Sequence, residues 1–315
     1  MWSLLYLVAV TRTRGKAMTA TQLESAIADP SNGHEPADSA MEVACSIRRL
    51  PLRLAERAAK VSISLNPANA PLLEFADIAS PLPDSPLALT LLTTKYWGPA
   101  QRAFSVSFME ATPADLRTRI VSHLNAWSLR TGVSFAETAG VGDVRISRGP
   151  GGYWSYLGSD IKLVPANRQT MNLQGFTMNT PDSEFRRVIR HEAGHTLGFP
   201  HEHMRKELVE RIDPAKAYPY FLANQGWSKE MVDQQVLTPL NSASILGTAA
   251  DQDSIMCYQL PGAITYDGRP IRGGTDINAT DYSFAARIYP KSRSAGSQAG
   301  AADDWGVEED VDISV

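Results

Sequence analysis

Four of the six histidines of the chain fall in one short stretch, which reads HEAGHTLGFPHEH from His191 to His203. His191 and His195 are four positions apart, so a helix places both imidazoles on one face, one turn apart. Glu192 lies about 100° further round such a helix, too far to be a third ligand in the same plane. It is close enough to hydrogen-bond a water held by the same cation. The spacing therefore predicts a helix that presents two metal ligands and a neighbouring carboxylate.

The same stretch supplies a turn after the predicted helix. Gly198 tolerates the left-handed conformation that ends a helix and turns the chain sharply. Such a turn brings His201 back toward the cation as a third ligand. Three nitrogen ligands and one open position make a catalytic zinc site, so we predict that His191, His195 and His201 bind Zn²⁺.

The spacing HExxHxxGxxH is specific because it fixes five residues. At ordinary residue frequencies, a chance match in a chain of this length has odds on the order of one in 10⁵. The alternative is a polar helix whose histidines are solvated or hydrogen-bonded in the core, without a metal. Buried, unpaired imidazoles beside Leu197 and Phe199 would be unfavourable, and a metal ion removes that difficulty.

The bulk properties of the chain are those of an ordinary globular protein, with 315 residues, 43% hydrophobic and 20% charged. A net charge of −4 gives no reason to expect a nucleic-acid partner. No apolar stretch approaches the ~20 residues needed to span a bilayer. The first ten residues are apolar, but positive charge follows rather than precedes them, so they are not a clear signal peptide. Oligomeric state leaves no trace in the sequence.

Composition divides the chain into three parts. Residues 1–90 form an N-terminal segment, a candidate pro-region and linker, with helical spacing over 38–60 and a proline-rich stretch after it. Residues 91–290 read as a mixed domain of helices and strands. Residues 291–315 are rich in small and then acidic residues, which predicts a disordered tail.

Within the mixed domain, the pattern predicts a helix that starts with Thr112 as N-cap and runs to about Arg130. It would bury the apolar residues Leu116, Ile120, Leu124 and Trp127. A second helix, capped by Asp182 or Ser183, would carry the histidine stretch. Alternation of apolar and polar residues predicts strands over 103–109, 133–137, 143–147, 153–157 and 171–176.

The histidine stretch resembles the metzincin signature, and its continuation through Gly198–Glu202 resembles the astacin family. Three other segments are similar to that family: residues 254–258 (SIMCY) to its Met-turn, residues 153–158 (YWSYLG) to its edge-strand region, and residues 281–289 (DYSFAARIY) to its C-terminal end. The resemblance implies an α+β fold, the metzincin catalytic domain, with a mixed twisted sheet, an antiparallel edge strand, an active-site helix and a Met-turn. With Cys45 and Cys257 as its two cysteines, the chain departs from the two disulfides usual in astacins, so it is similar to a bacterial-type or otherwise divergent member.

The resemblance also implies roles for single residues. Met256 would form a hydrophobic floor beneath the zinc, with simple core packing as the alternative. Tyr258 would be both an additional metal ligand and a catalytic group that stabilises the oxyanion, unless it is an ordinary surface or core tyrosine. Glu202 would be a structural carboxylate that meets the mature N-terminus, or else an ordinary charge at a helix end. We expect His203 to face solvent.

These observations predict a zinc-dependent endopeptidase that cuts internal peptide bonds, with Glu192 as general base. The family resemblance implies in addition that the protein is secreted. The protein or peptide substrate would pair as an extended strand with the edge strand. Residues 1–90 would make the enzyme latent, with Cys45 or one of Asp77 and Asp84 blocking the zinc. The alternative for Cys45 is a small buried hydrophobe on a helix. Two rival functions are a zinc-stabilised binding module and a structural protein without metal.

Overall fold

The computed structural model describes residues 45–70, 94–240, 249–257 and 259–292, all of which belong to one compact unit, residues 43–315. Residues 293–315 of the predicted acidic tail, together with Asp77, Asp84 and Tyr258, lie outside the described residues. Among the described residues, no helix is long and apolar enough to cross a membrane.

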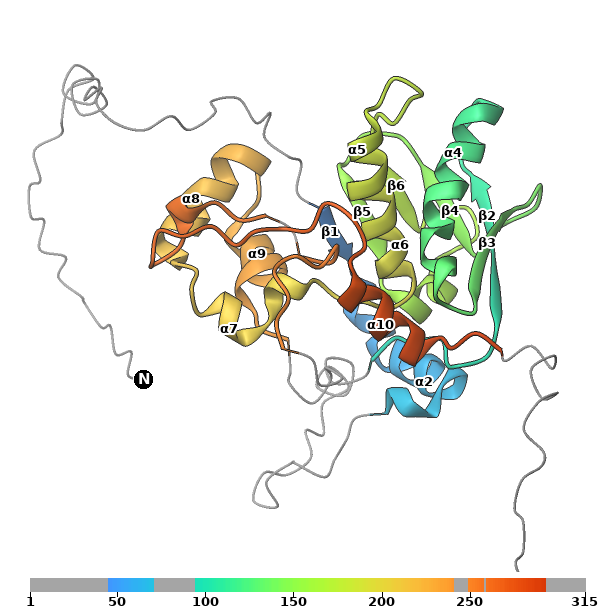
Figure 1. The fold of residues 1–315 in the computed structure, drawn as a ribbon, viewed down its shortest axis with the longest axis horizontal. Helices are drawn as coiled ribbons and strands as arrows, with labels where there is room; N and C mark the ends of the chain where they lie inside the picture. Colours follow the sequence, from blue (N-terminus) through green and yellow to red (C-terminus); the bar gives the residue numbers. More distant parts are fainter. Residues whose placement is uncertain (1–44, 71–93, 241–248, 258, 293–315) are drawn as a thin grey trace, which may run out of the picture. The chain divides into compact units, whose positions relative to one another are not determined.

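A twisted sheet of six strands organises the unit (Figure 1), in the spatial order β1-β5-β6-β4-β2-β3. Its strands are β1 (Cys45–Arg48), β2 (Arg102–Phe108), β3 (Val133–Glu137), β4 (Val144–Ser147), β5 (Tyr153–Tyr156) and β6 (Met171–Leu173). β5 runs antiparallel to β6, while every other pair of neighbouring strands is parallel. The mixed sheet with one antiparallel pair of strands confirms the α+β fold expected from the sequence.

The helix expected over residues 38–60, with a break or restart at Pro51, is wrong for residues 45–48 and right for residues 55–60. Residues 45–48 are strand β1, which pairs in parallel with β5 with Cys45 opposite Tyr153, and the helix α2 begins only at Ala55 and ends at Leu65. The open edge of β5 supplies backbone partners that outweigh the local helical spacing, because strand formation depends on the neighbouring strand more than on intrinsic preference. β5 is therefore covered by β1 rather than being the edge.

The remaining helices are the short α5, α7 and α9, the longer α4, α8 and α10, and α6 with the histidines. Their bounds are α4 (Ala114–Leu124), α5 (Asp182–Glu184), α6 (Arg190–Thr196), α7 (Lys206–Val209), α8 (Pro214–Gln225), α9 (Lys229–Val232) and α10 (Ala279–Ile288). Two π-helical turns, at Phe185–Ile189 and Asp233–Leu237, follow α5 and α9.

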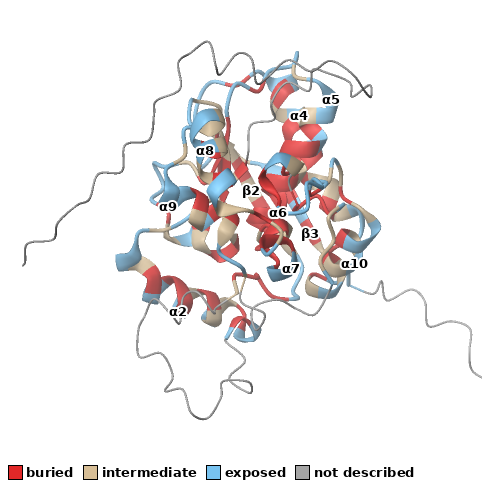
Figure 2. Ribbon diagram, turned by 90° about the vertical axis from the view of Figure 1, so that its left-hand side faces the viewer, coloured by how far each residue is buried: buried red, intermediate tan, exposed pale blue. Residues whose placement is uncertain are grey.

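The main core lies between the sheet and helices α4 and α6, and α6 is buried from His191 to its end (Figure 2). The four apolar residues expected to be buried between 116 and 127 are all buried, which confirms that part of the prediction. The expected caps are wrong by one or two positions. Pro113 and Pro181 occupy the N-cap positions of α4 and α5, and the Thr112 hydroxyl donates to the carbonyl of Glu110 instead.

Residues 45–70 are anchored to the rest of the unit by a buried side-chain amide. Asn69 donates to the carbonyl of Tyr96 at 2.7 Å and accepts from the Tyr96 amide at 3.1 Å. It also donates to the hydroxyl of Ser62 in α2 at 2.8 Å. Residues 45–70 thus share the compact unit of the sheet, and the domain boundary near residue 90 stays a prediction.

Candidate metal centre and active site

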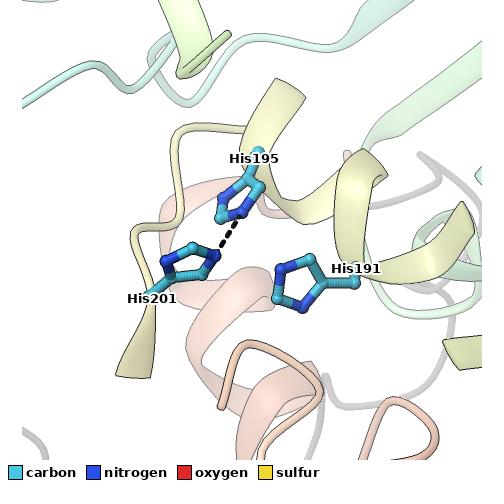
Figure 3. A group of neighbouring side chains, drawn as sticks. All are labelled: His191, His195 and His201. Carbon is cyan, nitrogen blue, oxygen red and sulfur yellow. Dashed lines mark hydrogen bonds between the residues drawn. The ribbon is translucent and has the colours of Figure 1, made fainter. Parts of the chain in front are cut away.

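Helix α6 positions the first two histidines of the predicted site. His191 and His195 lie one turn apart on it, as the four-residue spacing requires, and both are buried. Their ring centroids are 4.6 Å apart, and both rings point toward the same space (Figure 3). The helix predicted for the histidine stretch is therefore present.

The turn after α6 brings in the third histidine. Gly198 has a φ of +96°, the left-handed conformation expected for it, and a side chain there would lie 2.9 Å from the carbonyl oxygen of Lys95. After this turn, the ring of His201 lies 5.2 Å from that of His191 and 4.6 Å from that of His195. One nitrogen from each of the three rings lies within 4.8 Å of the others, a grouping that could hold a metal ion.

Hydrogen bonds fix which nitrogen faces the centre of this cluster. Nδ1 of His191 lies 2.6 Å from the carbonyl oxygen of Ile255, and Nδ1 of His195 lies 2.8 Å from that of Phe199. A carbonyl only accepts, so each Nδ1 carries the proton and each Nε2 keeps its lone pair. Burial lowers the pKa of His191 to about 4 and that of His195 well below the ordinary value, so both rings are neutral, as metal ligation needs.

Glu192, the residue after His191, has its carboxylate near one ring of the cluster. The residue is fully buried, and burial raises the pKa of its carboxyl to about 8, against the effects of the Cys45 thiol and of Arg187. The Cys45 sulfur, a ring nitrogen of His191 and a carboxylate oxygen of Glu192 all lie within 4.8 Å of one another. Strand β1 thus places Cys45 directly beside the histidine cluster.

Cys45 is buried, as expected if it were only a small hydrophobic residue of the core, but it lies on a strand and not on a helix. Burial, followed by the nearby Glu192 carboxylate, raises the pKa of its thiol well above the usual range. Both Cys45 and Cys257 are free thiols, so these two cysteines form no disulfide.

Met256 lies under the histidine-bearing helix. An added Cβ at Gly194, which stands between the two helical histidines, would lie 2.3 Å from its sulfur. The turn that carries Met256 is held by the buried carboxylate of Asp281 in α10, which accepts from the Ser254 hydroxyl at 2.6 Å and the Ile255 amide at 2.9 Å. Because the Ile255 carbonyl accepts from His191, Asp281 positions a histidine of the cluster through this turn.

The expectation for His203 is wrong. Its ring is fully buried, with its centroid 4.8 Å from that of the tilted His201 ring, and its Nε2 donates to the carbonyl of Gln235 at 2.9 Å. The chain after α9 covers it, which the local sequence does not show. Glu202 forms an ion pair at 3.0 Å with Arg205 from its own segment, so its carboxylate has a cation in place without the chain terminus.

Sequence reasoning missed two residues that contact this region. Asp281 begins the segment 281–289 that resembles the C-terminal end of the family. Its position three residues after Asn278 is a capping-box signal, from which its role could have been predicted. Gln235 carries no such signal, because its partners lie far away in the sequence.

Four features define the metzincin class of zinc protease folds. They are a mixed sheet with one antiparallel pair of strands, a buried helix bearing two histidines, a third histidine after a glycine turn and a methionine beneath them. The sequence model of one family of peptidases, Astacin, matches residues 91–266. The chain belongs to the astacin family, which confirms the resemblance seen in the sequence. Zn²⁺ is the metal that this membership implies, and the three neutral imidazoles fit it.

Individual relatives agree with this assignment. Zinc metalloproteinase nas-27 of Caenorhabditis elegans is 29% identical over 191 residues, which are 59% of this chain and 39% of that protein. The chain therefore spans about two fifths of the length of that relative. One solved structure of myroilysin is 30% identical with a TM-score of 0.58, and the match covers 64% of this chain and 97% of the other. A second myroilysin structure is 31% identical with a TM-score of 0.50, covering 62% and 86%.

Proposed function

We propose that this chain is a zinc-dependent endopeptidase that hydrolyses internal peptide bonds of proteins or peptides. The observation that carries the proposal is a cluster of three buried, neutral imidazoles with the buried carboxylate of Glu192 close to one of them, on a helix that contacts strand β5. A purely structural metal site has no use for such a carboxylate, which argues against the zinc-stabilised binding module.

His191, His195 and His201 would hold the metal, with Met256 packed beneath them. Bound there, Zn²⁺ would supply Lewis-acid polarisation of the scissile carbonyl and make the attacking water more acidic. Glu192 takes a proton from that water as it attacks, and then returns the proton to the leaving amine. The raised pKa of its carboxyl suits this exchange at neutral pH. Tyr258 is proposed, from its motif alone, as the additional ligand and oxyanion donor.

The substrate would bind as an extended strand along β5. In the structure β1 lies there, so the same backbone groups of β5 accept an extended chain. An extended protein segment fits this edge better than a compact small molecule does. Secretion, and cleavage of proteins outside the cell, are parts of the same proposal.

The general-base role is tested by Glu192→Ala in the full chain, with Glu207→Ala as a matched control because Glu207 is exposed on α7. Cleavage of a quenched-peptide library and zinc content are measured with and without a chelator. We expect Glu192→Ala to keep zinc and lose about 10³-fold or more in kcat/KM, while the control is unchanged. Near-normal turnover of Glu192→Ala would refute the assignment.

We also propose that β1 keeps the enzyme latent. It occupies the edge of β5 where substrate would pair, and it places the Cys45 sulfur beside His191 and Glu192. A thiolate is a good zinc ligand, so Cys45 would take the fourth position on the metal.

Latency is tested by comparing the full chain with its Cys45→Ser variant. The hydroxyl is a poor zinc ligand, so we expect higher basal cleavage from the variant at equal zinc content. Ser46→Ala is the control, since it alters the same strand without the thiol. Equal basal activity and equal activation rate for Cys45→Ser and the unaltered chain would show that the thiol does not block the site.

A further inference from the structure

Gln235 holds the outer edge of strand β1. Its side chain is buried on the turn Asp233–Leu237 that follows α9. The Ile47 amide donates to its Oε1 at 3.0 Å, and its Nε2 donates to the Ile47 carbonyl at 3.2 Å. One carboxamide thus pairs with both backbone groups of a single strand residue, as a neighbouring strand would.

Strand β1 therefore lies between two partners. On one edge it pairs with β5, and on the other the Gln235 carboxamide completes the ladder at Ile47. Ile47 is two residues beyond Cys45, or about 7 Å along an extended chain. Gln235 therefore bonds to β1 only two residues away from Cys45, whose thiol lies near His191 and Glu192.

The turn that carries Gln235 is fixed in place by the histidine segment. The carbonyl of Gln235 accepts a hydrogen bond from the buried ring of His203, which contacts the ring of His201. The carboxamide is thereby held at a constant position relative to the histidine cluster and to β5. When β1 leaves, both of its bonds to Ile47 are lost, and another extended chain in the same place would restore them.

We propose that Gln235 is a substrate-binding residue, which pairs with the backbone of one residue of an extended peptide opposite β5. This inference rests on the proposed peptidase function and names a specific contact in it. A carboxamide suits the task for either strand direction, because a 180° turn of its end exchanges donor and acceptor. The contact is made with the peptide backbone and not with a side chain. It therefore positions the peptide without selecting a particular amino-acid sequence.

The test uses the full chain and a peptide that it cleaves, whose cleaved bond is located by mass spectrometry. A set of analogues replaces each other peptide bond in turn by an ester, which removes one N–H donor without adding bulk. For each analogue, the ratio of its kcat/KM to that of the parent is measured. The fraction of enzyme opened by departure of β1 is the same for both substrates, so it cancels from the ratio.

We expect one ester position whose two- to tenfold penalty disappears in Gln235→Ala, because the acceptor of that N–H is gone. The control is Gln234→Ala, because the Gln234 side chain lies on the same turn but is exposed. This variant should keep every penalty of the unaltered chain. Penalties at positions that face β5 should remain in both variants. If no position loses its penalty in Gln235→Ala, the residue only holds β1 and the inference is wrong.

The same analogues separate this inference from the function on which it rests. If the zinc-loaded chain cleaves no peptide either as it is or as the Cys45→Ser variant, which lacks the proposed block, the proposed peptidase function fails. The ratio of Kd values for the ester and parent peptides, measured by calorimetry, then decides whether Gln235 binds an extended backbone. A position-specific ratio that depends on Gln235 supports the contact, and ratios independent of Gln235 overturn it.

Discussion

Replacing Gly194 by alanine tests how the metal centre is packed. Gly194 lies within α6 between His191 and His195 and is buried. An added Cβ would lie 2.3 Å from the sulfur of Met256, 3.1 Å from its methyl carbon and 3.3 Å from an atom of the Trp127 ring. Ordinary contacts between such atoms are about 3.5–4.0 Å, so Met256 would have to move.

Two effects of opposite sign decide the outcome. Alanine in a helix interior is favoured over glycine by about 1 kcal/mol. Overpacking of a dense core is unfavourable by about 1–3 kcal/mol, and the close approach to the Met256 sulfur places this case near the middle of that range, since the flexible methionine can absorb part of the clash. We therefore expect Gly194→Ala to lower the free energy of unfolding by about 1 kcal/mol.

A second effect should appear in metal binding. Displacing Met256 moves its neighbour Ile255, whose carbonyl orients the ring of His191. Loss of such an orienting bond commonly weakens metal affinity by about 10-fold or more. The assays are urea unfolding of the zinc-loaded and chelator-treated chain, and competition for zinc against a chromogenic chelator.

The double variant gives the decisive comparison. Met256→Ala removes the atoms that clash, at a cost of about 2–5 kcal/mol by itself. In that background Gly194→Ala should become stabilising by about 1 kcal/mol, because only the helix preference is left. If Gly194→Ala stabilises the unaltered chain, or if its effect is the same in both backgrounds, Met256 does not pack against α6 as described.

Two further substitutions test the contacts that hold the site and the N-terminal segment. Asp281→Ala leaves the buried Ile255 amide without its acceptor, so we expect the free energy of unfolding to fall by about 2–3 kcal/mol and the zinc affinity to fall with it. Asp281→Asn should have an intermediate effect. Calorimetry with and without chelator measures both quantities, and an unchanged zinc affinity would contradict the link from α10 to His191. Asn69→Ala removes both hydrogen bonds to the Tyr96 backbone, so we expect residues 45–70 to become several-fold more sensitive to limited proteolysis. Equal cleavage rates for the variant and the unaltered chain would show that this amide does not anchor the segment.

The cluster of three histidines could be predicted from the sequence because its geometry is mostly local. The four-residue spacing fixes two rings on one helical turn, and Gly198 alone permits the left-handed turn that returns His201. The buried apolar stripe of α4 was predictable for the same reason, since a helical period repeats within one segment.

The caps were less well predicted, because they depend on which residue first leaves the extended conformation. Thr112 and Asp182 have side chains suited to capping, but each stands beside a proline that the structure uses instead. The N-cap falls on the proline in both helices, so the position of the polar side chain alone does not locate the first helical turn.

Residues 45–48 and 203 were predicted wrongly, and Gln235 was not predicted at all, because their environments are set by distant parts of the chain. Strand β1 exists because β5 offers an unfilled edge, and Ile47 and Gln235 are 188 positions apart. His203 is buried because the turn that carries Gln235 folds over it. Short-range spacing therefore determined the histidine cluster and the family, whereas only the tertiary structure decided what lies beside the cluster along β5. The physical reason is that pairing between distant strands leaves no periodic pattern in either segment.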